Sequence, residues 1–184
     1  MIDVIKFLKI REPYGFLSNF WPSKIIYDDR EWATSEHLYQ AMKHLGSSYE
    51  EDVRKASSAW VAMKMGRDTE HPPRENWESI KDDVMRHVLA LKFSQSESLT
   101  VQLLATNDIV LVEHGYHDKY WADGGDGSGL NRLGEILMEV REVIRINKNE
   151  SRQFEIKVDN EPIMYVSSLT SYLHELSKIT GMKK

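Results

Sequence analysis

The sequence predicts a mostly helical α+β protein with a few short strands. Apolar residues at helical spacing, together with helix-capping residues, dominate the stretch 34–146. Short runs rich in β-branched residues occur near the N-terminus and after residue 153. The chain has 184 residues, of which 41% are hydrophobic, so it can bury the core of one ordinary domain.

The first segments indicate two strands separated by an aromatic loop. Residues 4–8 are apolar and partly β-branched, which favours a strand, and residues 24–27 favour a second strand that ends in a turn at Asp28 and Asp29. The loop at 13–22 is unusually rich in aromatic side chains, namely Tyr14, Phe16, Phe20 and Trp21.

Five helices are predicted next. Four of them begin at a capping residue or are followed by a glycine, and the fourth in chain order has a regular apolar stripe. They are 34–45, capped by Thr34 or Ser35 and stopped by Gly46; 50–56; 58–65, followed by Gly66; 76–93, capped by Asn76; and 94–104, opened by the capping-box pattern Ser94-x-x-Glu97.

The remaining elements are a strand at 109–113, a glycine-rich loop at 124–129, and a helix from Asn131 to about Ile146. A polar stretch at 147–153 then separates a main domain, 1–147, from a C-terminal extension, 148–184. In the extension, alternating residues 154–158, a turn at 159–162 and residues 163–166 predict a hairpin, and an amphipathic helix runs from Leu169 to Gly181. Because its apolar faces need a cover, we expect the extension to pack on the main domain or to form a homodimer.

Composition excludes several classes of protein. The net charge of −5 and pI near 5.8 argue against broad, non-specific binding to nucleic-acid backbone. Without cysteine there is no disulfide or thiol nucleophile. No apolar run approaches the roughly 20 residues of a membrane span, and no signal peptide is evident, so we expect a cytoplasmic protein with no membrane partner.

Metal and triad chemistry are not expected. Glu113-His114 and His117-Asp118 are the best metal-ligand candidates, but no His-Glu-x-x-His pattern or third-ligand spacing accompanies them. No Gly-x-Ser-x-Gly elbow occurs either. The bulky apolar residues of the middle helices are expected to serve packing rather than binding; they include Trp60, Met63, Met65, Trp77, Met85 and Leu91.

The helix 34–45 carries the most informative pattern. One face gathers a carboxylate, a phenol, an amide and an amine, and the opposite face is apolar, with Leu38, Ala41, Met42 and Leu45. The polar set is Glu36, Tyr39, Gln40 and Lys43. The spacing alone fits either a solvated surface helix or a functional face. We expect Glu36 to point away from the core, so that replacing it would leave folding almost unchanged.

The glycine-rich loop also has two interpretations. Glycines allow backbone to approach a ligand, and the following helix N-terminus can bind an anion, so the loop fits a phosphate or ribose cradle as well as a flexible turn. It matches neither the Walker nor the Rossmann pattern.

Together these motifs, in this order, resemble the NADAR superfamily, and in particular its YbiA-like riboflavin-intermediate N-glycosidases, over about residues 5–146. The motifs are Gly15-Phe16-Leu17-Ser18-Asn19-Phe20; Trp32 with Thr34-Ser35-Glu36-His37; Tyr39-Gln40-Ala41 and Lys43; Met65-Gly66-Arg67; Asn76-Trp77 with Lys81 and Met85; Lys92-Phe93; and Gly129-Leu130-Asn131-Arg132-Leu133-Gly134 with Leu137-Met138-Glu139-Val140-Arg141. The sequence departs from the family at Ala122, where glycine is usual.

The resemblance implies a compact, single α+β domain that hydrolyses N-glycosidic bonds of ribose-phosphate compounds without metal or redox cofactor. Two substrate classes are associated with the family. One is aminopyrimidine ribose-phosphate intermediates of riboflavin synthesis, and the other is ADP-ribose attached to a base, including ADP-ribosylated guanine in DNA. An alternative is a module that binds NAD or ADP-ribose without turnover.

The resemblance also implies roles for individual residues. Glu36 corresponds to the catalytic carboxylate, which would stabilise positive charge on the sugar and activate water. Lys43 is the expected Schiff-base amine, with Lys81 and Lys92 as alternatives. Trp121 would stack on the leaving base, Asn19 and Asn131 would bind ribose hydroxyls, and Gly129 would hold phosphate. The other expected substrate-binding residues are Phe20, Trp32, Ser35, Tyr39, Gln40, Arg67, Lys81 and Asp123.

Overall fold

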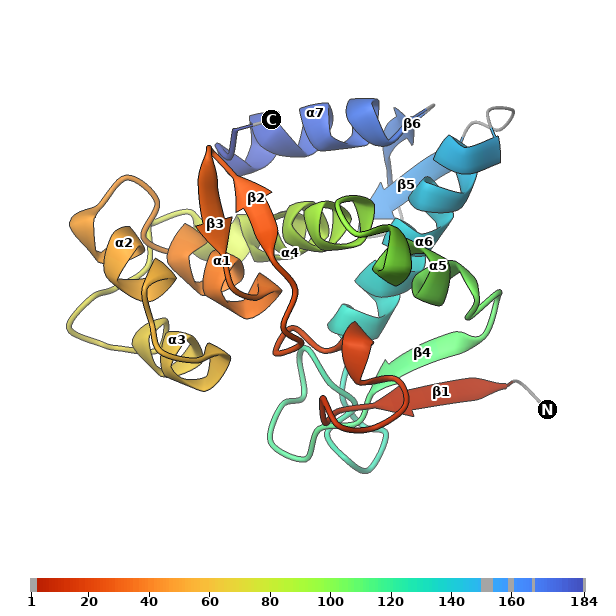
Figure 1. The fold of residues 1–184 in the computed structure, drawn as a ribbon, viewed down its shortest axis with the longest axis horizontal. Helices are drawn as coiled ribbons and strands as arrows, with labels where there is room; N and C mark the ends of the chain where they lie inside the picture. The colour runs from red at the N-terminus through yellow and green to blue at the C-terminus, as the bar shows by residue number, and fades with distance from the viewer. Residues whose placement is uncertain (1–2, 150–153, 159–160, 167, 184) are drawn as a thin grey trace.

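The computed structural model describes residues 3–149, 154–158, 161–166 and 168–183. In these ranges the chain is mostly helical, with a few short strands, which confirms the predicted fold class (Figure 1). The helices are α1 (Ser35–Met42), α2 (Ser48–Arg54), α3 (Ala59–Met65), α4 (Trp77–Ser94), α5 (Glu97–Leu104), α6 (Arg132–Asn149) and α7 (Leu169–Thr180). The strands are β1 (Val4–Phe7), β2 (Ile25–Tyr27), β3 (Arg30–Trp32), β4 (Val110–Glu113), β5 (Phe154–Val158) and β6 (Glu161–Val166), and a 3₁₀ turn, η1, covers Gly15–Leu17.

The strands form three two-stranded sheets. β1 lies parallel to β4, with Phe7 opposite Glu113, so the N-terminal strand is joined to the segment between α5 and α6. β2 and β3 form a hairpin whose second strand the sequence analysis did not predict. Its two turn residues, Asp28 and Asp29, have φ of 54° and 55°, which suits a tight two-residue hairpin turn.

The C-terminal hairpin is also present, with β5 antiparallel to β6. The turn predicted at 159–162 falls partly outside the described residues, at 159–160, and Glu161 and Pro162 already belong to β6.

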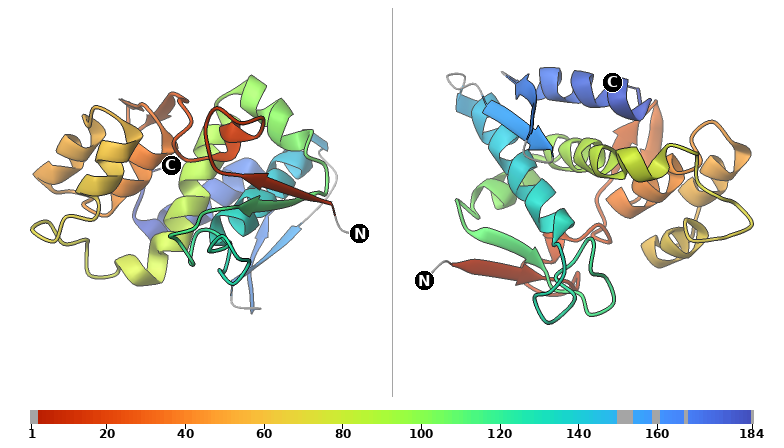
Figure 2. Two further views of the ribbon diagram at one scale, coloured as in Figure 1. Left: turned by 90° about the horizontal axis from the view of Figure 1, so that it is seen from below. Right: turned by 180° about the vertical axis from the view of Figure 1, so that it is seen from behind.

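Helix α4 is the centre of the molecule. Helices α1, α5, α6 and α7 all pack against it, and Figure 2 shows α7 lying along it while α6 crosses it. Its apolar stripe is buried as predicted, with Val84 and Val88 fully covered. Two capping predictions are wrong: Asn76 makes no side-chain cap, and α5 is capped by Ser96, whose Oγ accepts from the Leu99 N–H, because Ser94 still belongs to α4.

The last helix of the extension is part of the core. Tyr172 and Leu176 of α7 are fully buried against the main helices, and α7 ends at Gly181, whose φ of +68° is the left-handed conformation of a helix stop. Arg74 donates to the Thr180 carbonyl over 2.7 Å, and the Lys183 N–H donates to the Tyr27 hydroxyl, also over 2.7 Å. Helix α6 runs without a break across the boundary predicted at residue 147.

One core assignment is wrong. Trp60 is 54% exposed, and the Lys64 ammonium lies 4.3 Å from the centre of its ring. Helix α3 packs on α1 and buries Ala59 and Ala62, which are three residues apart and share a face, so Trp60 is left on the other side. Met63 and Met65 are only partly buried.

Candidate active site

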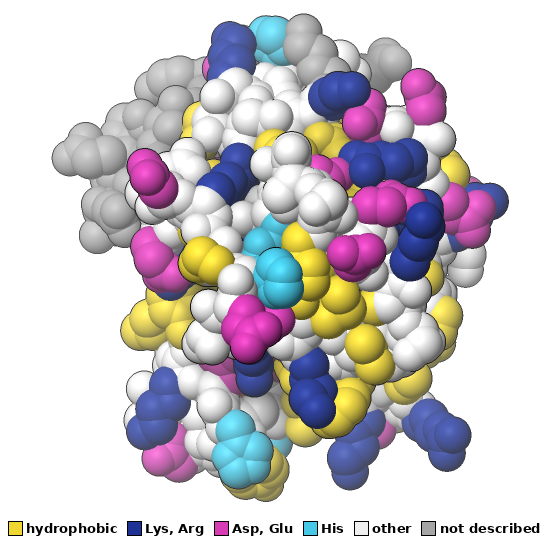
Figure 3. All heavy atoms as spheres, turned by 90° about the vertical axis from the view of Figure 1, so that its left-hand side faces the viewer, with side chains coloured by type: hydrophobic (Ala, Val, Ile, Leu, Met, Phe, Trp, Pro, Cys, Tyr) yellow, Lys and Arg dark blue, Asp and Glu magenta, His cyan; other side chains and the backbone are white. Residues whose placement is uncertain are grey.

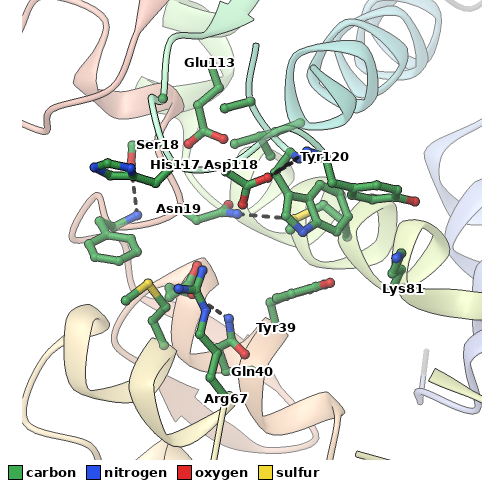
Figure 4. Close-up of a pocket in the computed structure, with 18 of the residues that line it drawn as sticks. Ser18, Asn19, Tyr39, Gln40, Arg67, Lys81, Glu113, His117, Asp118 and Tyr120 are labelled. Atoms are coloured by element: carbon green, nitrogen blue, oxygen red, sulfur yellow. Dashed lines mark hydrogen bonds between the residues drawn. The ribbon is translucent and has the colours of Figure 1, made fainter. Parts of the chain in front are cut away.

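A cavity of about 600 Å³ lies between the N-terminal loop, helices α1 and α4, and the segment that joins β4 to α6. Nine of the predicted site residues line it: Asn19, Phe20, Glu36, Tyr39, Gln40, Lys43, Arg67, Lys81 and Trp121. Figure 4 shows Gln40 and Arg67 on one side of the cavity and Glu113 and Asp118 on the other. Side chains that are up to 102 positions apart in the sequence therefore meet in one space.

Helix α1 is buried over its whole length, not only on its apolar face. It begins after Thr34, whose Oγ1 accepts a hydrogen bond from the His37 N–H. Glu36 is only 6% exposed, so its face of the helix is not the solvated surface that was one of the two alternatives. The polar face of α1 is covered by the loop around Asn19 and by the cavity walls rather than by open solvent.

Two contacts fix the start of α1 against the aromatic loop. The Glu36 N–H donates to the Asn19 carbonyl over 3.1 Å, and the Ser35 hydroxyl donates to the Asn19 Oδ1 over 3.0 Å. Asn19 in turn donates its amide to the sulfur of Met85 on α4. The loop, α1 and α4 are thus connected through one asparagine.

The Glu36 carboxylate is oriented from its own helix. Gln40, one turn later, donates Nε2–H to Glu36 Oε1 over 2.7 Å. Gln40 in turn packs directly on Gly66, where an added Cβ would come within 1.9 Å of Gln40 Oε1. A larger residue at this position would displace the Gln40 side chain, and the Gly66 carbonyl accepts a hydrogen bond of 2.7 Å from Lys43 Nζ.

Burial changes the acid–base properties of both predicted catalytic groups. It raises the pKa of Glu36 to about 7, although the hydrogen bond from Gln40 and the charges of Lys43 and Arg67 oppose this. Burial likewise lowers the pKa of Lys43 to about 8, against the pull of Glu36. The expected stabilisation of the Glu36 anion by the helix dipole is therefore outweighed by desolvation. Near neutral pH, both a carboxylate and a neutral amine are available in the cavity.

The three lysines considered for imine chemistry have different surroundings. Lys43 and Lys81 line the cavity. Lys81 donates to Glu78 over 2.6 Å and lies 3.9 Å from the Tyr120 ring centre. Lys92 is buried away from the cavity walls, where its Nζ donates to the Ser18 carbonyl over 2.8 Å and so supports the loop that carries Asn19.

Aromatic rings form one wall of the cavity. The rings of Tyr39 and Trp121 meet edge to face at 5.6 Å, and Tyr39 also contacts Trp77 at 5.2 Å. Trp77 and Met85 are buried core residues, as predicted, but they also line the cavity. These two residues therefore serve both the packing of the core and the wall of the cavity.

Five predicted substrate-binding residues do not line the cavity. Two of them, Trp32 and Ser35, make their hydrogen bonds within the N-terminal part of the chain. Trp32 has no exposed surface, and its indole N–H donates to the Tyr27 carbonyl across the β2–β3 hairpin. This corrects its assignment to substrate binding. Ser35 is fully buried and bonded to Asn19, as described above.

The other three stabilise the loop before α6. The Asn131 Oδ1 accepts a hydrogen bond from the Glu113 N–H, and its side-chain amide donates to the Leu111 carbonyl. Asn131 therefore fixes strand β4. Asp123 accepts from His114 over 2.8 Å and from the Gly125 N–H. Gly129 is packed on the backbone of the same loop, with an added Cβ only 2.3 Å from the Ala122 carbonyl oxygen. The Gly129 N–H donates to the Asp123 carbonyl over 2.9 Å, so this glycine serves the close packing of the loop on itself.

Glu113, His117 and Asp118 line the cavity but were considered from the sequence only as metal ligands. In the described part of the chain, no group of three or more His, Cys, Asp or Glu side chains is arranged to hold a metal ion. Their position in the sequence was the signal that could have placed them at the site. Glu113 ends a predicted strand and Asp118 follows it, and residues at the end of a strand often lie at a functional site.

None of the described helices is long and apolar enough to cross a bilayer.

Comparison with known proteins gives one consistent result. The NADAR domain model matches residues 6–145. N-glycosidase YbiA from Escherichia coli (strain K12) is 50% identical over 147 residues, which are 79% of this chain and 91% of that protein. An N-glycosidase from Nostoc punctiforme is 39% identical over 144 residues (77% and 92%), and a riboflavin biosynthesis protein from Vibrio vulnificus is 43% identical over 145 residues (79% and 40%).

A solved structure agrees with this. The NMR structure of E. coli YbiA matches with a TM-score of 0.75 and 48% identity, covering 83% of this chain and 91% of that one. With this similarity over most of its length, the protein is an enzyme of the N-glycosidase class. It belongs to the NADAR family, as its sequence motifs predict.

Proposed function

We propose that the enzyme hydrolyses the bond between C1′ of a ribose phosphate and a nitrogen of its base, and that the cavity between α1 and α4 is its active site. The observation that supports this most directly is that Glu36 and Lys43 line one cavity. They share that space with two further cations, Arg67 and Lys81, and with an aromatic wall. The cations suit phosphate, and the aromatic rings suit a planar base.

Glu36 has two roles in this mechanism. As the C1′–N bond lengthens, positive charge builds on the sugar, and a carboxylate fixed by Gln40 in a site of low polarity stabilises that charge. The same carboxylate then takes a proton from the water that attacks C1′. No metal is needed for either step.

Lys43 offers a second route to the same product. Its pKa, lowered by burial to about 8, leaves part of the amine uncharged near neutral pH. A neutral amine can attack C1′ and displace the base nitrogen, which leaves with a proton while the ribose ring opens to an imine on Lys43. Water then hydrolyses this imine, which releases the sugar as its aldehyde and restores the amine. The hydrogen bond to the Gly66 carbonyl holds the amine near the cavity before substrate arrives.

We infer two candidate substrate classes: aminopyrimidine ribose phosphates of the riboflavin pathway, and ADP-ribose attached to a base, including guanine in DNA. The names of the relatives that concern riboflavin support the first class. The net charge of −5, and the interspersed acidic and basic side chains on the face in Figure 3, favour a small substrate over extended contact with a DNA backbone.

The experiment is to incubate the purified protein with one substrate of each class and to separate the products by chromatography. Release of the free base from one of them identifies the class. The Glu36→Gln variant in parallel shows whether the activity depends on this cavity. A rise in melting temperature without any product, for NAD or for either substrate, would contradict turnover and favour a binding module.

A further inference from the structure

Glu113 is a carboxyl group in the active-site cavity that the mechanism above does not use. It is the last residue of β4, and both of its backbone groups are fixed: its N–H donates to Asn131 Oδ1 over 2.9 Å, and its carbonyl accepts from the Asp123 N–H, also over 2.9 Å. Its carboxyl makes no hydrogen bond or ion pair with the described residues. Figure 4 shows this carboxyl pointing into the cavity, across from Gln40 and Arg67. A half-buried carboxyl group that points into a cavity from a rigidly held backbone, with no partner among the described residues, calls for a functional explanation.

The charges around Glu113 differ from those around Glu36. Burial, and to a smaller extent the carboxylates of Asp118, Glu36 and Asp123, raise the pKa of Glu113 to about 8. Lys43 and Arg67, by contrast, act on Glu36 and oppose the rise of its pKa. Among these neighbours, Asp118 accepts hydrogen bonds from the N–H groups of Tyr120 and Trp121. Asp123 is paired with His114 and Lys6. His117 lines the same cavity. Near neutral pH, Glu113 therefore keeps its proton more readily than Glu36 does.

Glu113 also lies at a junction. A second, mostly apolar cavity of about 680 Å³ adjoins the first, and Leu8, Ser18, Phe20 and Glu113 line both. A base that leaves the sugar on the side away from the phosphate-binding cations would pass this carboxyl.

We propose that Glu113 is the general acid of the reaction and protonates the leaving nitrogen; this inference rests on the proposed function. As the C1′–N bond breaks, its electron pair stays on the nitrogen, which takes the proton of the Glu113 carboxyl. Water adds to C1′ and gives its proton to Glu36. The Glu36 proton then returns to Glu113 through solvent, so water is the only reactant consumed besides the substrate. If the Lys43 amine rather than water displaces the base, Glu113 protonates the same nitrogen as it leaves.

The test compares Glu113→Gln with wild type on two substrates that differ in their need for a proton. An aminopyrimidine ribose 5-phosphate has a poor leaving group, whereas 4-nitrophenyl β-ribofuranoside 5-phosphate releases a stable anion. We expect Glu113→Gln to lose about 100-fold or more in kcat on the first substrate and less than about threefold on the second. Glu36→Gln should lose activity on both, and the exposed Glu75→Gln on neither.

The pH profile gives an independent measure. Wild-type kcat/KM should fall at alkaline pH as Glu113 ionises near pH 8, and this alkaline fall should be absent in Glu113→Gln. Glu113→Asp, which keeps an acid at the same place, should retain the alkaline fall at a reduced rate. This second variant also separates chemistry from a folding defect.

Equal losses on both substrates, or an unchanged alkaline fall in an active Glu113→Gln variant, would overturn the role of Glu113. A wild-type protein that cleaves neither of these compounds, nor ADP-ribosylated guanosine, would instead overturn the proposed function, and the role of Glu113 with it. The two failures are distinguished by the wild-type measurement alone.

Discussion

Replacing Glu36 with glutamine separates the cost of burying this side chain from its use in catalysis. Because burial raises the pKa of Glu36 from 4.5 to about 7, ionising it costs roughly 3 kcal/mol more in the folded protein than in the unfolded chain, at 1.36 kcal/mol per pKa unit. Below pH 4.5 the group is protonated in both states and there is no penalty. Between pH 4.5 and 7 the unfolded chain loses the proton first, so the wild type becomes progressively less stable relative to the variant.

The Glu36→Gln variant has no ionisation at this position, and its side-chain oxygen can still accept from Gln40. We therefore expect its free energy of unfolding, relative to wild type, to improve by about 2–3 kcal/mol between pH 5 and pH 8, while turnover is abolished. Urea unfolding at the two pH values, followed by circular dichroism, measures the difference. A variant whose stability difference from wild type is the same at both pH values would refute the reasoning, because it would show that Glu36 titrates in the folded protein as it does in water.

Three further perturbations test the site and the fold. Borohydride added during turnover should trap an adduct on Lys43 and not on Lys92, which lies away from the cavity, and peptide mapping locates the adduct. If no adduct forms and Lys43→Ala is still active, direct attack by water is the mechanism. Arg67→Ala should raise KM for a ribose phosphate by about tenfold, with little change in melting temperature because Arg67 is exposed, whereas an unchanged KM would remove it from phosphate binding. Truncation after Asn147 removes the fully buried Tyr172 and Leu176, so the protein should lose thermal stability and aggregate; a truncated protein as stable and monodisperse as the full chain would contradict the packing of α7.

Local signals predicted the helices well because each signal acts within a few residues. Thr34, one of the two expected caps, caps α1, and Gly181 ends α7 as expected from its left-handed conformation. The errors occur where two candidates compete over a short distance. Ser94 and Ser96 both precede an acceptable first turn, and the choice of Ser96 depends on how far α4 continues.

Helical spacing placed Glu36, Gln40 and Lys43 together correctly, but it could not tell whether their face meets water or protein. That depends on contacts over longer distances, such as the bond between Glu36 and the Asn19 carbonyl and the packing of Gln40 on Gly66. The same limit explains Trp32 and Gly129. A tryptophan and a glycine beside a site motif can either touch the ligand or shape the scaffold, and only the tertiary packing decides.

The burial of α1 has a chemical consequence that no motif carries. A solvated helix face would leave Glu36 fully ionised and Lys43 fully protonated at neutral pH, and neither a proton relay nor an imine would then be accessible. Enclosing both groups moves their pKa values toward each other, to about 7 and about 8. The scaffold residues that the sequence assigned to substrate, such as Ser35 and Asn131, contribute by holding the enclosure closed: Ser35 fixes the loop over Glu36, and Asn131 fixes the end of β4 that carries Glu113. Their substitution should therefore alter the pH dependence of the reaction before it alters substrate affinity.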